Sequence, residues 1–575
     1  MLKTLMGSIR EYKRSSALAA IFVIFEVILE VLIPYLMAKI IDVGMSQGSI
    51  TYTVLISLAT IVAAFASLYC GASSGKYAAN AAAGFAKNLR HDIFYSIQDF
   101  SFENIDKFST SSLVTRLTTD ITNIQNAYQM IVRVLVRAPI MLVFALFMAI
   151  SINARLSLTF AVAIPILFVG LFAIAGNAFP YFRTVFKKYD RLNCVVQENV
   201  NAVRVVKAYV REDHEIDKFH GVSKEVYDKF KAAEKIVAFN APLMQFVMYG
   251  AMIVMSLVGG KYIVYGDMLS GELTSLIVYT VMILSSLMML SMIFVMILMA
   301  RSSAERVVEV LNEKSTMTSP ENAVTSVADG SIEFDNVSFG YSDDENKYVL
   351  TDINVKIKSG ETIGIIGGTG SSKSSLVQLI PRLYDVKKGS VKVGGVDVRN
   401  YDIEALRDQV AMVLQKNVLF SGTIAENIRW GNENASDEEV QRVCKLAQAD
   451  SFVQEFPRKY ETVLDQGGTN VSGGQKQRLC IARALLKKPK ILILDDSTSA
   501  VDTKTDSLIR KAFREEIPNT TKLIIAQRVS SVEDADRIIV LDEGKIAGIG
   551  TSEELLKTNK IYQEVYYSQM KGAEK

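Results

Sequence analysis

Six long apolar segments constrain the fold of this 575-residue chain more than any other feature. They lie at about residues 16–45, 51–76, 126–151, 154–180, 240–264 and 271–300. Each reaches or exceeds the roughly 20 residues that a helix needs to cross a bilayer. Helices also satisfy their backbone polar groups internally, as a lipid-exposed chain must. The sequence therefore predicts six transmembrane helices.

Charged residues are unevenly distributed over the connections between these segments. The connections after the first, third and fifth segments are short and carry little charge beyond Arg155 and Lys261, whereas the two long connections are rich in Lys and Arg. The positive-inside rule places the long connections and both termini in the cytoplasm. Valines at helical spacing predict helices that continue into the cytosol, with turns within 102–112 and 209–217. A solvated hairpin without contacts is the alternative.

Two arginines, Arg133 and Arg137, lie one helical turn apart near the cytoplasmic end of the third segment. A charge inside the membrane indicates a functional site by default, but long side chains near an interface can extend to the headgroups. We expect both arginines to do so. The Met-rich stretch 282–299 could form an adaptable pocket for apolar substrates, but we favour helix packing and lipid contact as the role of these residues.

Composition separates the chain into two regions. Half of all residues are hydrophobic, and the apolar blocks end near residue 310. The net charge of only +2 argues against a nucleic-acid-binding protein, which usually carries a basic excess. Past a polar linker, short β-rich runs alternate with helical patterns, which is typical of an α/β domain. We expect a transmembrane domain at 1–315, a linker at 316–330 and an α/β domain at 331–575.

The strand-like run TIGIIG leads into GGTGSSKSS, which has the register of a phosphate-binding P-loop. Backbone N–H groups at a helix N-terminus favour bound phosphate, the loop lysine reaches the β and γ oxygens, and the next serine supplies a hydroxyl to Mg²⁺. Ser372 replaces the usual Gly before the lysine and requires a negative or mildly strained φ. The residues of the loop are Gly367, Gly368, Thr369, Gly370, Ser371, Ser372, Lys373, Ser374 and Ser375.

Downstream, the apolar strand ILILDD at 491–496 ends in two carboxylates. This arrangement suits Asp495 as a ligand of Mg²⁺ through water and places Asp496 toward the γ-phosphate. Such a strand is common by itself. In order with the P-loop and the intervening VSGGQ, it predicts a nucleotide site in the α/β domain.

The segment VSGGQKQR at 471–478 resembles the signature motif of ATP-binding cassette (ABC) proteins. Tyr341 in FGY resembles the aromatic on which adenine stacks, and Gln415 resembles the glutamine of the Q-loop. The signature core is Ser472, Gly473, Gly474 and Gln475, and the segment that resembles the D-loop is Ser499, Ala500, Val501 and Asp502.

With six spans ahead of one cassette, the whole chain resembles a half-transporter of the multidrug-exporter type. The resemblance implies that two chains pair and that ATP lies between the P-loop of one cassette and the signature of the other. It also implies that cytoplasmic turns couple the cassettes to the membrane helices. Mg²⁺ would be held by Ser374, Gln415 and Asp495.

Besides Ser372, three positions depart from the pattern of this family. Asp496 replaces the Glu that polarises the attacking water, and its shorter side chain displaces the carboxylate by about 1 Å or more, which can cost on the order of 100-fold in rate. Gln527 replaces a His and cannot carry the charge of an imidazolium. Gln466 replaces an acidic residue. We expect this chain's own ATP site to bind nucleotide but hydrolyse it poorly, while its signature completes the competent site of a different partner chain.

We therefore expect one half of a heterodimeric ABC exporter that uses ATP and Mg²⁺ to move amphipathic or apolar compounds out across the cytoplasmic membrane. The expected partners are a second half-transporter with an intact catalytic Glu, membrane lipid and a small amphipathic substrate, without nucleic acid. Lipid or peptide export, a homodimer with two slow sites, and a nucleotide-sensing regulatory subunit are the alternatives. The intact VSGGQ argues against a sensor, because a signature is useful only opposite a hydrolysing partner.

Overall fold

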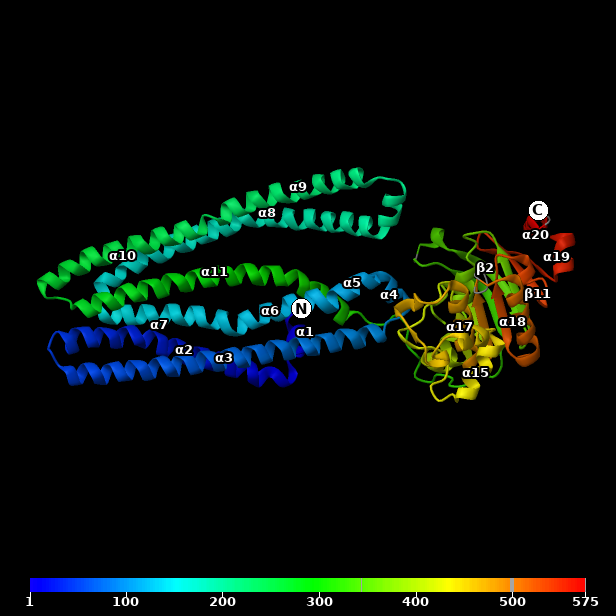
Figure 1. The fold of residues 1–575 in the computed structure, drawn as a ribbon, viewed down its shortest axis with the longest axis horizontal. Helices are drawn as coiled ribbons and strands as arrows, with labels where there is room; N and C mark the ends of the chain where they lie inside the picture. Colours follow the sequence, from blue (N-terminus) through cyan, green and yellow to red (C-terminus); the bar gives the residue numbers. More distant parts are fainter. Residues whose placement is uncertain (343, 497–500, 574–575) are drawn as a thin grey trace. The chain divides into compact units, whose positions relative to one another are not determined.

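The computed structural model describes residues 1–573 except residue 343 and residues 497–500. It divides into two compact units, one of Met1–Gln98 with Ser109–Glu313 and the other of Asp99–Phe108 with Lys314–Lys575. The first unit is helical and the second is α/β (Figure 1). The chain therefore contributes the short segment Asp99–Phe108 to the second unit before it returns to the first.

The first unit is built from long helices. In the described part of the chain, six helical stretches are long and apolar enough to cross a membrane, which confirms the six predicted spans. The turn between α8 and α9 falls at residues 209–211, inside the window predicted for it. The helices are α1 Leu2–Gly7, α2 Lys13–Lys39, α3 Ile50–Gln98, α5 Thr110–Thr115, α6 Ile121–Met130, α7 Val136–Ile152, α8 Ala154–Ala208, α9 Glu212–Val237, α10 Asn240–Tyr265 and α11 Ser270–Asn312, and the π-helical turns are η2 Ile40–Met45, η3 Arg116–Asp120 and η4 Ile131–Leu135.

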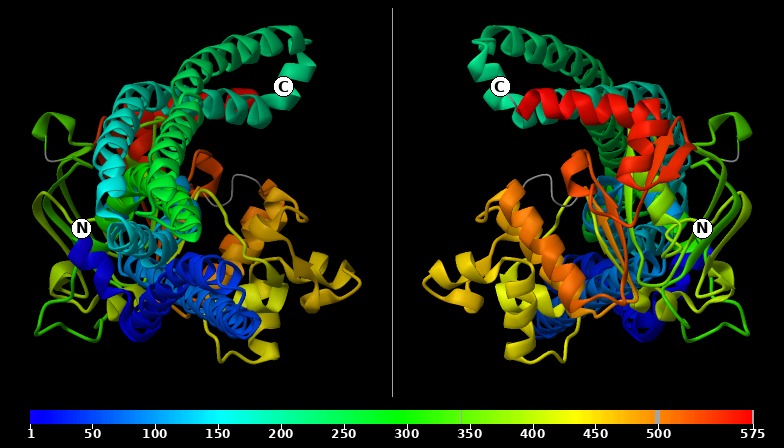
Figure 2. Two further views of the ribbon diagram at one scale, coloured as in Figure 1. Left: turned by 90° about the vertical axis from the view of Figure 1, so that its left-hand side faces the viewer. Right: turned by 90° about the vertical axis from the view of Figure 1, so that its right-hand side faces the viewer.

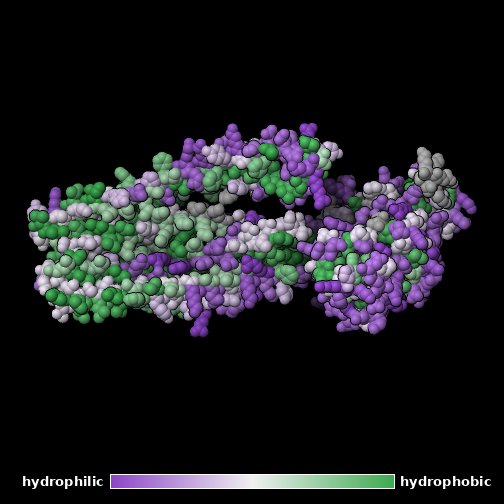
Figure 3. Space-filling view, in the orientation of Figure 1, coloured by the Kyte–Doolittle hydropathy of each residue, from purple (hydrophilic) through white to green (hydrophobic). Residues whose placement is uncertain are grey.

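The interior of this unit is apolar and so is much of its surface. Val23, Val27 and Val31 recur every four residues along α2 and pack against α7 and α11, where Met141 and Tyr279 are buried. On α3, by contrast, large apolar side chains point outward, and the space-filling view shows hydrophobic residues over α2, α7 and α10 (Figure 3). An apolar exterior fits helices that contact lipid.

The predicted position of the Arg137 side chain is wrong. Its guanidinium does not extend to the headgroups but forms ion pairs with Glu26 and Glu30, two carboxylates on α2. These glutamates are four residues apart and share one helix face. The signal in the sequence was VIFEVILEV, where two acidic residues interrupt an apolar segment at helical spacing. A partly buried pair of ion pairs within the helical unit thus satisfies the arginine.

The described residues of the second unit form three sheets. The antiparallel sheet has the order β2-β1-β4-β5, the larger sheet has the order β12-β11-β3-β10-β9-β6, and β7 pairs with β8. In the larger sheet only the β11–β12 pair is antiparallel. The strands are β1 Ile332–Phe339, β2 Leu350–Ile357, β3 Thr362–Gly367, β4 Lys388–Val393, β5 Val396–Asp397, β6 Val410–Val413, β7 Gly422–Thr423, β8 Val463–Leu464, β9 Ile491–Asp495, β10 Thr521–Ile525, β11 Arg537–Asp542 and β12 Lys545–Gly550.

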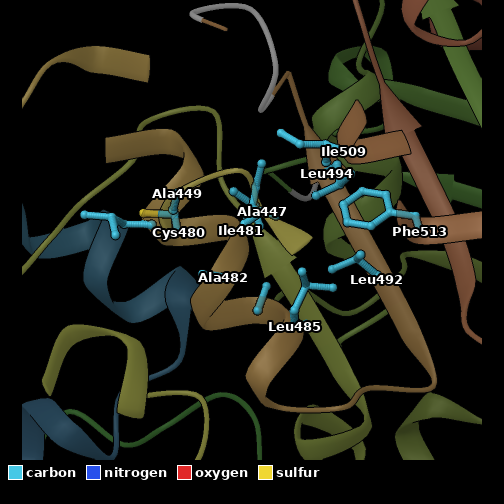
Figure 4. Close-up of a cluster of buried hydrophobic side chains, with 14 of the residues drawn as sticks. Ala447, Ala449, Cys480, Ile481, Ala482, Leu485, Leu492, Leu494, Ile509 and Phe513 are labelled. Atoms are coloured by element: carbon cyan, nitrogen blue, oxygen red, sulfur yellow. The ribbon is translucent and has the colours of Figure 1, made fainter. Parts of the chain in front are cut away.

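Both faces of the six-stranded sheet are covered, one by helices that include α17 and α18 and the other by α12, α13 and the four-stranded sheet (Figure 2). Leu492 and Leu494 on β9 pack with Phe513 of α18 and Leu485 of α17 (Figure 4), whereas Ile491 and Ile493 face the other cluster. Burial on both faces explains why this strand is a continuous apolar run. The helices are α12 Lys373–Gln378, α13 Ile403–Gln409, α14 Ile424–Arg429, α15 Asp437–Leu446, α16 Asp450–Glu455, α17 Gly473–Leu486, α18 Thr503–Glu516, α19 Ser552–Thr558 and α20 Lys560–Ala573.

The segment expected as the first cytoplasmic turn forms the short helix α4, Phe102–Phe108, and packs within the second unit. The hydroxyl of Tyr384 donates to Asp106 at 2.7 Å, and the ring of Phe102 meets the Tyr384 ring edge-on at 6.0 Å. The Asn104 amide donates to the carbonyl of Lys314 at 3.2 Å. This turn is therefore a packed element and not a solvated hairpin.

Candidate nucleotide-binding site

The candidate site lies at the carboxyl ends of neighbouring parallel strands. β3 leads into the P-loop, β9 ends at Asp495, and β10 lies between these two strands and leads to Gln527. The β9–β10 register pairs Asp495 with Ile525. Loops at this edge of an open α/β sheet form the crevice in which ligands bind. The topology thus brings together three motifs that are distant in sequence.

The backbone of the P-loop is tightly constrained. A Cβ on Gly367 would lie 2.2 Å from the carbonyl oxygen of Leu541, so no other residue fits there. Gly370 has a φ of +86°, which favours glycine. Ser372 also lies in the left-handed region, with φ +67° and ψ +27°. Of the two conformations expected for Ser372 the strained one is present, at a cost of about 1 kcal/mol.

The ammonium group of Lys373 lies inside the loop. Its Nζ donates to the carbonyl oxygens of Gly367 at 2.9 Å and Gly368 at 2.8 Å, and to the Ser371 hydroxyl at 3.2 Å. Burial lowers the pKa of Lys373, while the carboxylates of Asp495 and Asp496 oppose that shift. The ammonium group is therefore held at the loop where the motif predicts phosphate.

Ser374 and Asp495 meet directly beside the loop. The Ser374 hydroxyl donates to Asp495 Oδ1 at 2.9 Å. Burial is the main cause that raises the pKa of Asp495, with the neighbouring Asp496 adding to it. A hydroxyl and a carboxylate are the oxygen ligands that Mg²⁺ prefers, so this pair fits the predicted metal. Gln415, the third predicted ligand, joins the cluster through Asp496, to which its amide donates at 3.4 Å.

Asp496 and Gln527, the two main departures from the family pattern, are in contact. Gln527 Nε2 donates to Asp496 Oδ2 at 2.7 Å, the same oxygen that Gln415 approaches. Asp496 is 8% exposed and has a φ of +47°. Burial raises its pKa, and the two amide hydrogen bonds lower it. The sequence did not reveal Gln477, whose buried amide donates to the Asp496 carbonyl at 3.4 Å.

Tyr341 lies beside the P-loop helix. Its hydroxyl is 2.9 Å from the Ser375 hydroxyl, and its ring packs edge-on against Phe339 and Tyr384 at 5.0 and 5.2 Å. The residue is 52% exposed. Because about half of the residue is exposed, Tyr341 can offer an adenine-stacking surface.

The signature forms the N-terminus of α17, a helix of 14 residues. Ser472 caps it by accepting from Gln475 N–H, and the Gln475 side chain accepts in return from Ser472 N–H. Ser472 and Gly473 are exposed and Gly474 is half-buried. Among the residues that the structure describes, no hydrogen bond joins this motif to the P-loop of the same chain. The exposed helix end is available to a second molecule.

Asp502 is the one described polar residue of the predicted D-loop. It caps the N-terminus of α18, accepting from Thr505 N–H at 2.9 Å and from the Thr505 hydroxyl at 2.7 Å. These hydrogen bonds lower the pKa of Asp502. Val501 beside it is buried. Ser499 and Ala500 lie outside the described residues.

Comparisons with known proteins agree along the chain. Residues 16–288 match the family model of the ABC transporter transmembrane region and residues 350–499 match that of the ABC transporter. The uncharacterized ABC transporter ATP-binding protein YfiB of Bacillus subtilis is 36% identical over 98% of both chains. The ATP-dependent lipid A-core flippase of Desulfotalea psychrophila is 33% identical over 84% of both chains.

The fold agrees as well. A bacterial Atm1-family ABC exporter with ATP bound superimposes with a TM-score of 0.82 and 23% identity, over 97% of this chain and 98% of that one. The chain belongs to the ABC transporters, as a half-transporter with one transmembrane region and one ATP-binding domain.

Proposed function

We propose that this chain is one half of a heterodimeric ABC exporter whose own ATP site binds nucleotide but hydrolyses it slowly. The observation that carries the proposal is the Asp496 carboxylate, one methylene shorter than the family's Glu, whose Oδ2 accepts from Gln527 at 2.7 Å. The partner supplies an intact catalytic Glu. The ATP-binding domain and both termini are cytoplasmic, and the transported compound is amphipathic or apolar and moves outward.

Asp496 is a poor base for geometric and electronic reasons. A general base must reach the proton that it removes, and Asp496 is drawn instead to the amides of Gln527 and Gln415. Gln527 is neutral and cannot offer the positive charge of a protonated histidine to the γ-phosphate. The reach of the base and the charge opposite it are thus both reduced at one site.

Binding of ATP does not depend on these two residues. The P-loop N–H groups and Lys373 compensate the charge of the phosphates. Mg²⁺, held by Ser374 and Asp495 with Gln415 nearby, would screen the charge between the β- and γ-phosphates. Nucleotide retention without rapid cleavage is therefore the expected behaviour of this site.

The intact signature supports pairing with a different chain. Ser472 and Gly473 are exposed at the positive end of α17, where they can contact the γ-phosphate of ATP on a partner. In a homodimer this signature would face only slow sites. Lipid export is the main alternative for the substrate, since one relative is a lipid A-core flippase. A nucleotide sensor is disfavoured because it would not need the signature.

The test is ATP turnover by the purified chain alone and after coexpression with a half-transporter that has Glu after its Walker B aspartate. We expect slow turnover by this chain alone and turnover by the pair well above the sum of the separate chains. Turnover by this chain alone that equals the pair would overturn the heterodimer.

If adenine stacks on Tyr341, replacing this residue should cause a modest loss of affinity for nucleotide. Tyr341→Ala should weaken nucleotide binding about fivefold, because a lost aromatic stack costs roughly 1 kcal/mol, whereas Tyr341→Trp should preserve it. Tyr341→Phe is the matched control, since it removes only the hydroxyl that contacts Ser375. Titration with a fluorescent ATP analogue measures all four proteins. Equal affinity in Tyr341→Ala and wild type would mean that adenine stacks elsewhere.

A further inference from the structure

A charged cluster lies inside the helical unit, on the helices that form the first and third spans. Arg137 on α7 forms ion pairs with Glu26 Oε1 and, at 2.6 Å, with Glu30 Oε2. Glu26 is 8% exposed. It lies ten residues after residue 16, where the first apolar segment begins, which is about 15 Å of helix and half of a hydrocarbon core of roughly 30 Å. The cluster is therefore deep in the membrane region.

The cluster borders a cavity of about 510 Å³. Small residues of α3 keep the cavity open: an added Cβ on Gly71 would lie 3.0 Å from Glu26 Oε1, and one on Gly75 would lie 3.6 Å from Arg133 Nη1. Leu68 and Ala72, which are exposed on α3, give the open side of the cavity an apolar part. Hydrophilic residues gather between α7 and α2 in an otherwise hydrophobic region (Figure 3). The volume is in the range of small-molecule sites.

One oxygen of the Glu26 carboxylate has no hydrogen-bond donor within the described residues, whereas the other accepts from Arg137. The oxygen without a donor, Glu26 Oε2, is buried. Leaving a buried charged acceptor unpaired is costly, and acidic residues within membrane segments usually mark substrate or ion pathways. Two carboxylates share the Arg137 guanidinium, and with Arg133 on the same wall the formal charges of the cavity balance. What the triad of Glu26, Glu30 and Arg137 lacks is therefore a hydrogen-bond donor to Glu26 Oε2. A cationic donor would complete it.

We infer that this cavity binds the protonated amine of an amphipathic cation, with an ammonium N–H group donating to Glu26 Oε2 and the apolar body lying along Leu68 and Ala72. One free carboxylate oxygen suits an amine better than a metal ion, which requires several oxygen ligands. Arg133 lines the same cavity and has no ion pair within the described residues, so it disfavours a second positive charge. The inference rests on the proposed export of amphipathic compounds and specifies their charge.

The experiment measures equilibrium binding of two dansyl probes to the full chain in lipid nanodiscs without nucleotide. One probe carries an aminopentyl chain and the other a pentyl chain of the same length without the amine. We expect Glu26→Gln to weaken binding of the amine probe about tenfold, as for a lost hydrogen bond to a charged group, and to leave the neutral probe unchanged. Glu225→Gln, an exposed ion-pair residue on α9, is the matched control without effect.

A second variant, Arg133→Gln, tests the inference independently in case Glu26→Gln misfolds. Arg133→Gln removes the positive charge that opposes the amine and should tighten the amine probe only. The inference would be overturned if Glu26→Gln weakened binding of both probes equally and Arg133→Gln changed neither. It would also be overturned if the amine probe bound all variants with equal affinity. These readouts need neither partner nor hydrolysis. Slow turnover by the assembled pair would count against the proposed function alone.

Discussion

Replacing Gly473 with Glu should reduce ATP turnover by the assembled pair to almost nothing. Gly473 is exposed at the start of α17, where the proposed partner holds the γ-phosphate of its ATP. A carboxylate there repels the phosphate in a site that excludes water, which costs several kcal/mol and hence on the order of 100-fold or more in rate. The chain itself should fold normally, because an acidic residue in the first turn favours a helix.

Two control variants accompany Gly473→Glu. One separates the effect of charge from that of side-chain size, and the other separates this chain's own ATP site from the site on the partner. Gly473→Gln has nearly the same size without the charge and should retain more turnover. Asp496→Asn alters a base that is already misplaced, at a backbone φ of +47° that Asn tolerates, and should lower turnover only modestly. The measurement is the steady-state ATPase rate of each pair, and co-purification checks that each pair assembles. If Asp496→Asn abolishes turnover as fully as Gly473→Glu, this chain's own site is catalytic and the proposed division is wrong.

The membrane spans could be predicted because a bilayer imposes length and polarity on each helix separately. The contacts between the spans could not be predicted from the sequence. Arg137 was expected at the headgroups because its position was judged along its own helix, whereas α2 offers it two carboxylates. The spacing of Glu26 and Glu30 marks one helix face, but only packing shows which helix that face meets.

For the nucleotide site, too, some features could be predicted from the sequence and others could not. The P-loop and the carboxylates after β9 could be identified from spacing, because phosphate and Mg²⁺ require those residue types in that order. The contact of Asp496 with Gln527 depends on β9 and β10 being neighbours in the sheet, which no local pattern specifies. The φ of Ser372 likewise depends on how closely the loop packs, and the sequence left both conformations open.

The double substitution Asp496→Glu with Gln527→His should raise ATP turnover by this chain alone on the order of 100-fold, the loss attributed to a misplaced base. The longer carboxylate regains its reach, and the change at 527 removes the amide that holds Oδ2 at 2.7 Å. The chain's own signature is intact, so two copies can supply both halves of each site. The comparison therefore requires no knowledge of the natural partner.

Each single substitution identifies which residue limits the rate. Asp496→Glu alone should recover part of the rate, whereas Gln527→His alone should recover little, because it leaves the short base in place. Glu tolerates a φ of +47° less well than Asp, at a cost of about 1 kcal/mol, so thermal unfolding of each variant must accompany the ATPase assay. ATP-dependent crosslinking of the double variant verifies that two copies associate. Association without any gain in turnover would show that Asp496 and Gln527 do not limit hydrolysis, and the pairing proposed from them would lose its basis.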